Sequence, residues 1–181
     1  MKPYGKVSPL LLLVALSGCA SIAVNQDYNP RTDFGSYHTF RWAPEPQNPT
    51  GDARIDNNPL LDSRIRSAVE RHLTAKGFQK RDGSNADLLV AYQVAISDET
   101  DISTLSTYYG YRRTGIIVQD TRIREYEQGT LILDLVDASR NELVWRGTAQ
   151  SEIRSDMSPQ DREARIDEAV RTILAQYPPG S

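Results

Sequence analysis

Cysteine and histidine are scarce in this sequence. Its 181 residues include one cysteine, Cys19, and two histidines, His38 and His72. A single thiol excludes an intramolecular disulfide and a cluster of thiolate metal ligands, so the fold must be held by its hydrophobic core. Neither histidine lies in an HExxH motif, and a zinc site would need both of them together with carboxylates brought near by the fold. We therefore expect no bound metal or other cofactor.

The sequence also contains no hydrophobic run long enough to cross a membrane as a helix. The longest apolar stretch, VSPLLLLVAL at residues 7–16, has about half of the roughly 20 residues that such a helix needs. Lys2 and Lys6 come before it, with no acidic residue, which is typical of a cleavable secretory signal. We therefore expect residues 1–18 to be a signal peptide.

A short motif, LSGC, ends this segment and includes the lone cysteine. An apolar residue, two small residues and a cysteine resemble the lipobox of bacterial lipoproteins, in which a peptidase cleaves before the cysteine and its thiol carries a diacylglycerol. The small Ser17 and Gly18 would let the peptidase close on the Gly18–Cys19 bond. Each buried acyl methylene contributes about 0.8 kcal/mol, so two or three chains make a lasting anchor. We expect Cys19 to be lipidated; the alternative is an ordinary signal with a chance cysteine.

The expected mature chain begins at Cys19 and is acidic. Residues 19–21 would form a short tether and residues 22–179 a single domain, a length sufficient for a real core. Loss of residues 1–18 removes two lysines and no acid, which changes the formal charge from −3 to −5. Such a chain lacks the basic footprint of a nucleic-acid-binding protein. Ala20 stands where an aspartate would favour the inner membrane, so we expect an outer-membrane lipoprotein with its domain in the periplasm.

Periodic apolar residues predict the regular elements of this domain. The expected strands lie at residues 22–30, 36–44, 86–97, 114–128, 129–139 and 141–153. One helix should begin at Pro59 after the N-cap Asn58 and end at Gly77, and another should begin at Pro159 after Ser158. These elements indicate an α+β fold: a two-layer sandwich with a mixed, largely antiparallel sheet of about six to seven strands and two helices on one face.

Several segments together resemble a known family. They are DYNPRTDFGSYHTFRW, DSRIRSAVERHLTAKGFQK, ADLLVAYQVAI, GTLILDLVDASRNELVWRGTAQ and REARIDEAVRTILAQYPP. They are similar to the bacterial lipoproteins catalogued as domain of unknown function 4136 (DUF4136), over about residues 22–179. The resemblance implies a membrane-tethered periplasmic domain. It implies no reaction and supplies no active-site residues.

Motifs that would carry catalysis are lacking. No SxxK, nucleophile elbow, GxGxxG or Walker pattern occurs. We expect His72, on the apolar stripe of the first helix, and His38, beside Phe40, to be core-edge histidines with hydrogen-bond partners. Asp134 should face the polar side of its strand, and Asp137 should open a turn. We therefore expect no catalytic residues and no enzymatic activity; a hydrolase assembled from distant Ser, His and Asp side chains is a third hypothesis.

The acidic run DETD at residues 98–101 is a further candidate for cation binding, besides Asp134 and Asp137. Its oxygen ligands would suit weak calcium binding, but a solvated acidic loop is the simpler interpretation.

One segment is rich in residues typical of binding surfaces. TYYGYRRTG, at residues 107–115, contains the candidate interaction residues Tyr108, Tyr109, Tyr111, Arg112 and Arg113. Tyrosine and arginine are enriched at interface hot spots. At a hairpin tip they would contact an envelope protein, and our first hypothesis is a non-enzymatic envelope lipoprotein that binds a partner or supports the envelope. The alternative is a lipoprotein that binds a small ligand or cell-wall glycan through this loop and Tyr92; a variable loop without function is the bland interpretation.

Overall fold

The computed structural model describes residues 22–44, 50, 52–56, 58–83, 85–110 and 115–180. For residues 101–110 and 115–123 the description covers the backbone alone. The predicted lipidation and cleavage residues, Cys19 and Gly18, lie outside the described residues.

The described chain forms one mixed sheet and two α-helices. The elements are β1 (Ala23–Tyr28), η1 (Phe34–Ser36), β2 (Thr39–Trp42), α1 (Pro59–Ala75), β3 (Gln79–Lys80), β4 (Leu88–Gly110), β5 (Gly115–Asp137), β6 (Glu142–Glu152) and α2 (Pro159–Leu174). The six strands lie in the order β1-β6-β5-β4-β2-β3. The β2 strand runs parallel to β3 and β4, and the other neighbours are antiparallel. The predicted α+β class is confirmed.

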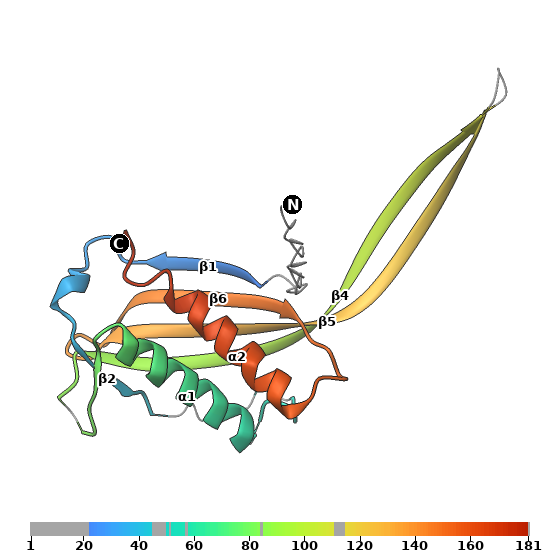
Figure 1. Cartoon of the computed structure of the whole chain (residues 1–181). Helices are drawn as coiled ribbons and strands as arrows, with labels where there is room; N and C mark the ends of the chain where they lie inside the picture. The colour runs from blue at the N-terminus through green and yellow to red at the C-terminus, as the bar shows by residue number, and fades with distance from the viewer. Residues whose placement is uncertain are drawn as a thin grey trace, which may run out of the picture.

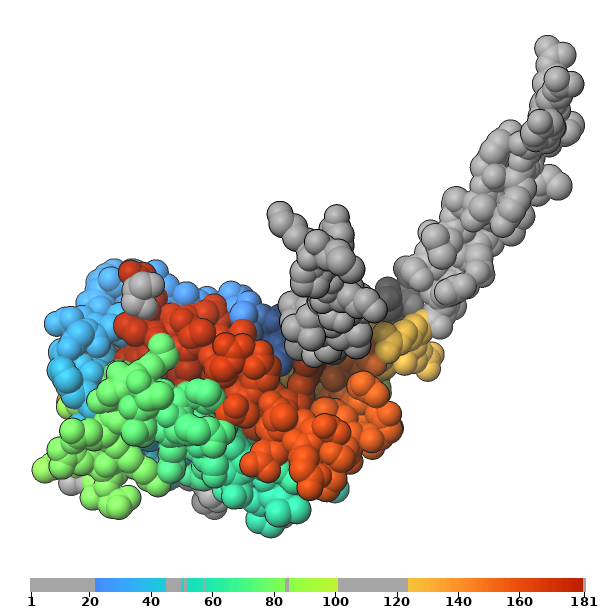
Figure 2. All heavy atoms as spheres, in the orientation of Figure 1, coloured from blue at the N-terminus to red at the C-terminus, as the bar shows by residue number. Residues whose placement is uncertain are grey.

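Both helices cover the same face of the sheet and lie against each other (Figures 1 and 2). Their ends are set by local chemistry. The Asn58 side chain accepts a hydrogen bond from the Leu61 backbone N–H, and the Ser158 hydroxyl accepts one from the N–H of Asp161. Gly77 follows α1 with φ 93°, the left-handed conformation that glycine adopts without strain. The predicted helix starts and the glycine stop are confirmed.

The core lies between the sheet and the helices. Leu133, Leu135 and Trp145 on the covered face are fully buried against residues such as Ile173 of α2. Gly147 allows α2 to lie this close: a Cβ added there would overlap the Trp145 ring and come within 2.5 Å of Ile173 Cγ2. Close packing of this kind supplies most of the stability of a domain without disulfides.

The strands differ from the prediction in three places: β4 continues past the expected end at Ser97 to Gly110, the short β3 was not expected, and β5 joins two expected strands. Residues 114–128 and 129–139 were expected to be separate strands, but β5 runs unbroken through Gly129. The glycine serves packing rather than a turn, because an added Cβ would lie 3.1 Å from Ile153 Cγ1.

The continuous β4 and β5 strands leave the body of the protein as a two-stranded ribbon (Figure 1). The last pair of β5 with β6 is Gln128↔Glu152, whereas β4 and β5 stay in register to Gly110↔Gly115. We call residues 98–110 and 115–127 the arm. At the usual rise per strand residue it is about 40 Å long.

Candidate functional site

The arm carries the interaction residues predicted from the sequence. Tyr108 and Tyr109 are in β4, where they pair with Ile117 and Ile116 of β5 near the far end of the ribbon. The predicted hairpin is therefore confirmed in its backbone. Tyr111, together with Arg112 and Arg113, lies outside the described residues, as do the side-chain placements of Tyr108 and Tyr109. The acidic residues 98–101 fall inside β4 rather than in a loop, so that expectation was wrong.

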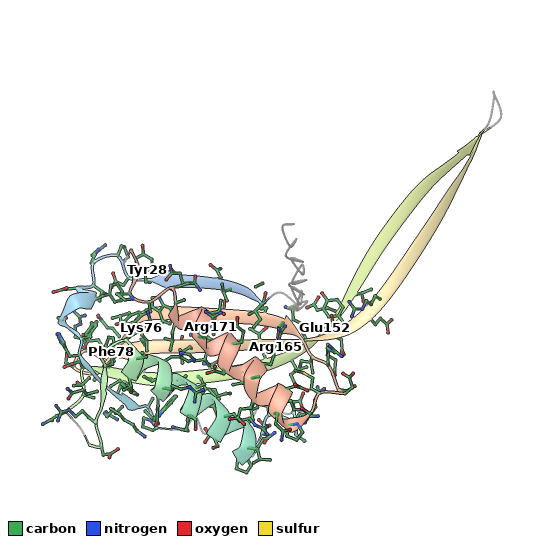
Figure 3. The ribbon with its side chains drawn as sticks, viewed as in Figure 1. Tyr28, Lys76, Phe78, Glu152, Arg165 and Arg171 are labelled. Atoms are coloured by element: carbon green, nitrogen blue, oxygen red, sulfur yellow. The ribbon has the colours of Figure 1, made fainter. Side chains whose placement is uncertain are left out.

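Ion pairs hold the arm where it leaves the body. Arg124 Nη2 lies 2.5 Å from Glu152 Oε1, and Figure 3 shows Glu152 at this junction. Three residues further along β5, Glu127 Oε1 lies 2.5 Å from Arg54 Nη1. Exposed pairs of this kind contribute little individually to the stability of the fold. They connect the base of the ribbon to β6 and to the segment that contains Arg54.

His72 joins the two helices. Its Nε2 lies 2.7 Å from Asp167 Oδ1, and Arg71 Nη2 lies 2.5 Å from the same oxygen. Burial raises the pKa of Asp167, but the hydrogen bonds from Arg71 and His72 outweigh it and leave the pKa below its usual value. The predicted core-edge histidine with a hydrogen-bond partner is confirmed.

His38 lies just before β2 and is exposed, so its predicted core-edge position was wrong. Its Nδ1 is 3.0 Å from the Ser36 carbonyl oxygen. The Asp87 carboxylate accepts hydrogen bonds from the backbone N–H groups of His38 and Thr39 and from the Thr39 hydroxyl. This carboxylate ties β2 to the start of β4. The arrangement orients the backbone and leaves the imidazole at the surface.

Asp137 is a nearly buried carboxylate that several donors surround. It accepts bonds from the Ser139 N–H and hydroxyl, the Arg140 N–H and the Tyr37 hydroxyl. Burial raises its pKa, but these bonds outweigh burial and lower it to about 2. Burial and this neighbouring carboxylate also raise the pKa of Tyr37. The predicted turn-opening role of Asp137 is confirmed, and Tyr37 adds a link to the core that the sequence did not indicate.

Asp134 faces away from the helices, as predicted, yet it is only 8% exposed. Its two carboxylate oxygens each accept a hydrogen bond from Arg146 at 2.7 Å. The two residues are paired across β5 and β6, which explains the contact. A bidentate Arg–carboxylate pair of this kind satisfies both charges.

The described part of the chain contains neither a cluster of metal ligands nor a membrane-spanning helix. No group of three or more His, Cys, Asp or Glu side chains there is placed to hold a metal ion. Among the same residues, no helix is both long and apolar enough to span a membrane.

A recess beside β2 was not predicted from the sequence. It is lined by Arg41, Trp42, Lys80, Arg81, Asp82 and Gly83. The run KRDG at residues 80–83 was the only available signal, because Arg41 and Trp42 join it through strand pairing.

The fold resembles several solved structures. A PDZ domain protein from Parabacteroides distasonis matches with a TM-score of 0.60 and 16% identity, over 89% of this chain. The chain spans only 36% of the length of that protein. A DUF4136 family protein from Bacteroides thetaiotaomicron matches with a TM-score of 0.48 and 18% identity, covering 87% of this chain and 96% of its own.

A third structure, a PelC dodecamer from Paraburkholderia phytofirmans, has a TM-score of 0.47 and 13% identity, with 86% of this chain and 96% of that chain covered. No curated protein matches the sequence. The model of the family described as domain of unknown function (DUF4136) matches residues 24–179, nearly the whole described chain. The chain therefore belongs to the DUF4136 family.

Proposed function

We propose that this protein is a lipid-anchored envelope protein that acts by binding a partner protein through its arm. The arm itself carries the proposal. Two-stranded ribbons are at best marginally stable in water, because they lack a third strand and a packed face. Yet β4 and β5 keep their register far beyond the last strand that flanks them. Contact with a partner would bury the arm and supply the missing stabilisation.

The residues at the end of the arm suit such a contact. The pairs Tyr108↔Ile117 and Tyr109↔Ile116 concentrate aromatic and β-branched residues where the ribbon is farthest from the core. The sequence continues with Tyr111 and two arginines. Tyrosine and arginine dominate interface hot spots because they offer large contact areas and hydrogen bonds at low entropic cost.

The proposed anchor, Cys19, is close in sequence to the first strand. Ile22, the first described residue, packs partly against the core, and only two residues separate it from Cys19. A lipid on Cys19 would therefore hold the body close to the membrane. We place the protein at the outer membrane with its domain in the periplasm, on the sequence of residues 16–20.

Metabolic labelling tests the anchor. Cells producing the full-length protein are grown with radiolabelled palmitate, and membranes are separated by density. We expect label in the outer-membrane protein and its loss in Cys19→Ser, which should also accumulate in the uncleaved form. Equal labelling of the variant, or recovery of the unmodified protein in the soluble fraction, would overturn the anchor.

Site-specific photocrosslinking tests the arm. A photoreactive residue replaces Tyr109 in the lipidated protein in its native cells, and adducts are identified by mass spectrometry. Gln93, exposed on β4 within the body, is the matched control on the same strand. A discrete protein adduct at position 109 alone supports the proposal. Adducts with glycan or lipid would contradict a protein partner and favour the alternative ligand. The absence of any adduct would show that the arm is not the binding element.

A further inference from the structure

A recess opens at the edge of the sheet where β3 ends. It has a volume of about 500 Å³ and is lined in part by β2. The β2 strand pairs with the first residues of β4, at the end of β4 opposite the arm (Figure 1). The wall of the recess contains three cationic side chains, Arg41, Lys80 and Arg81, and one acidic side chain, Asp82. The wall therefore carries a formal charge of +2 in a chain whose formal net charge is −3. This local reversal of sign indicates a site for a negative ligand.

Two of the three cations lack a carboxylate partner among the described residues. Arg41 Nε is buried without a hydrogen-bond partner, and its Nη1 makes only a long contact of 3.5 Å with the Trp42 carbonyl oxygen. Arg81 Nη2 donates only to Gln79 Oε1, at 3.3 Å. Within the described part of the chain neither arginine forms an ion pair. Arg41 Nε is itself shielded from solvent, so the donors that a ligand in the recess could reach are the ends of the two guanidinium groups and the Lys80 ammonium.

Trp42, the aromatic residue that lines the recess, is held in place by three side chains. Arg66 stacks over the Trp42 ring with its Cζ 4.5 Å from the centroid, and Tyr92 packs edge-on at 6.3 Å. Trp42 Nε1 donates to Glu70 Oε1 at 2.8 Å. The wall is thus already ordered before a ligand arrives, which reduces the entropy that binding must overcome.

Lys80 is positioned by the same carboxylate. Its Nζ lies 2.7 Å from Glu70 Oε1, so part of its charge is already compensated. The side chain is 42% exposed, and the ammonium retains donors for a second acceptor. The two arginines are therefore the main donors, with Lys80 as an auxiliary cation.

We propose that the recess binds a phosphate group. The guanidinium groups of Arg41 and Arg81 supply the planar donors that match phosphate oxygens. Arg41 and Arg81, which have no carboxylate partner among the described residues, fit a phosphate dianion better than a single carboxylate. The phosphate belongs either to a soluble metabolite or to a lipid headgroup, since both present the same oxygens. This site is independent of the arm and of the lipid anchor.

Tryptophan fluorescence of the full-length protein in detergent tests the site. The chain has two tryptophans, and Trp145 is fully buried in the core, so a change on titration reports on Trp42. The probes are inorganic phosphate and pyrophosphate, with acetate as the monocarboxylate comparison, at constant ionic strength. We expect a saturable change with the phosphates at concentrations below about 1 mM and binding of acetate at least about tenfold weaker, in keeping with charge-assisted contacts that contribute about 1.5–3 kcal/mol each.

Variants separate the site from general electrostatics. Arg41→Gln and Arg81→Gln should each weaken phosphate binding about tenfold or more, as expected for loss of one charge-assisted contact. Arg31→Gln makes the same charge change on an exposed residue after β1, at the other edge of the sheet, and should bind as the unmodified protein does. Because Arg81 is exposed, its variant should fold normally even if Arg41→Gln does not. The absence of a saturable change with either phosphate, or equal weakening by Arg31→Gln, would overturn the proposal.

Vesicles distinguish the two sources of phosphate. Residues 20–181, which include every described residue but neither the proposed signal peptide nor Cys19, are mixed with phosphatidic acid or phosphatidylcholine vesicles and separated by flotation. If the protein floats with phosphatidic acid vesicles but not with phosphatidylcholine vesicles, and Arg81→Gln does not float with either, the site binds a lipid headgroup. Saturable binding of free phosphate without flotation identifies a soluble ligand. Both results support the phosphate site, whereas flotation that is indifferent to Arg81 counts against it.

Discussion

The body and the arm are built from the same two strands but are stabilised differently. In the body, β4 and β5 have further strands on both sides, and side chains such as Leu88, Val90 and Leu133 are fully buried under the helices. In the arm each strand has only the other as its neighbour among the described residues. The same pair of hydrogen-bonded strands therefore lies in a packed core at one end and forms a ribbon without flanking strands at the other. The comparison teaches that burial, not strand pairing alone, holds this fold together.

The largest loss of stability is expected when a single methyl group is added at Gly147, in the body. In Gly147→Ala the new Cβ would overlap Trp145 and Ile173, and both are fully buried. Overpacking of this kind costs about 1–3 kcal/mol, and the upper half of that range is expected here. Urea denaturation measures it. Gly115→Ala, in the arm, is the matched control and should change the free energy of unfolding by less than about 0.5 kcal/mol; equal losses would erase the distinction between the two regions.

Removal of the Asp137 carboxylate should be the next largest effect. Asp137→Ala leaves the Tyr37 hydroxyl and the Ser139 and Arg140 N–H groups without their acceptor, which should cost about 1–3 kcal/mol at neutral pH. The pKa of this carboxyl is lowered from 3.8 to about 2 in the folded protein. Its contribution is therefore fully present above about pH 4 and is lost as the pH falls toward about 2.

Urea denaturation at several pH values checks this dependence. The difference in unfolding free energy between the unmodified protein and Asp137→Ala should be constant from about pH 7 to about pH 5 and shrink between about pH 4 and about pH 2. A difference that grows as the pH falls would contradict the assignment.

A smaller change of opposite sign is expected at Tyr177. Its ring is fully buried, and its hydroxyl has no hydrogen-bond partner within the described structure. Burial also raises the pKa of this hydroxyl well above its usual value. Tyr177→Phe removes the unsatisfied group and keeps the ring contacts with Phe34 and Trp145, so stability should rise by about 1 kcal/mol. Thermal unfolding measures the gain, and a clear loss would show that the hydroxyl does have a partner.

The smallest effect on stability should follow from the largest deletion. Replacement of residues 98–127 by Asn-Gly closes β4 and β5 with a tight hairpin turn where the flanking strand ends. We expect the free energy of unfolding to change by less than about 1 kcal/mol, because the core residues are untouched. The lipidated protein that carries this deletion should nevertheless no longer bind its partner. Global unfolding of the shortened chain would show that the arm belongs to the folding unit.

The parts of the fold set by local chemistry could be predicted from the sequence. Asn58 and Ser158 cap helices, Gly77 ends one and Asp137 opens a turn, and each depends on groups within a few residues. The tyrosines at 108 and 109 were correctly placed near a hairpin end for the same reason.

Features that depend on distant segments could not be predicted. The sequence alone suggests that Gly129 separates two strands. Its actual role is to leave room for the Ile153 side chain, and this contact cannot be predicted because the two residues are distant in sequence. The burial of Asp134 depends on Arg146 from the next strand. Likewise the phosphate recess combines β2 with the segment after β3, and no spacing within either segment indicates it.

The uninterrupted course of β4 and β5 also has a mechanical consequence. Each strand runs as one covalent backbone from the arm into the centre of the sheet. A pulling force at the tip would therefore travel along both strands and load the extended β5–β6 ladder in shear, together with the short β2–β4 ladder. The arm can therefore transmit tension from its tip to the two central strands of the sheet.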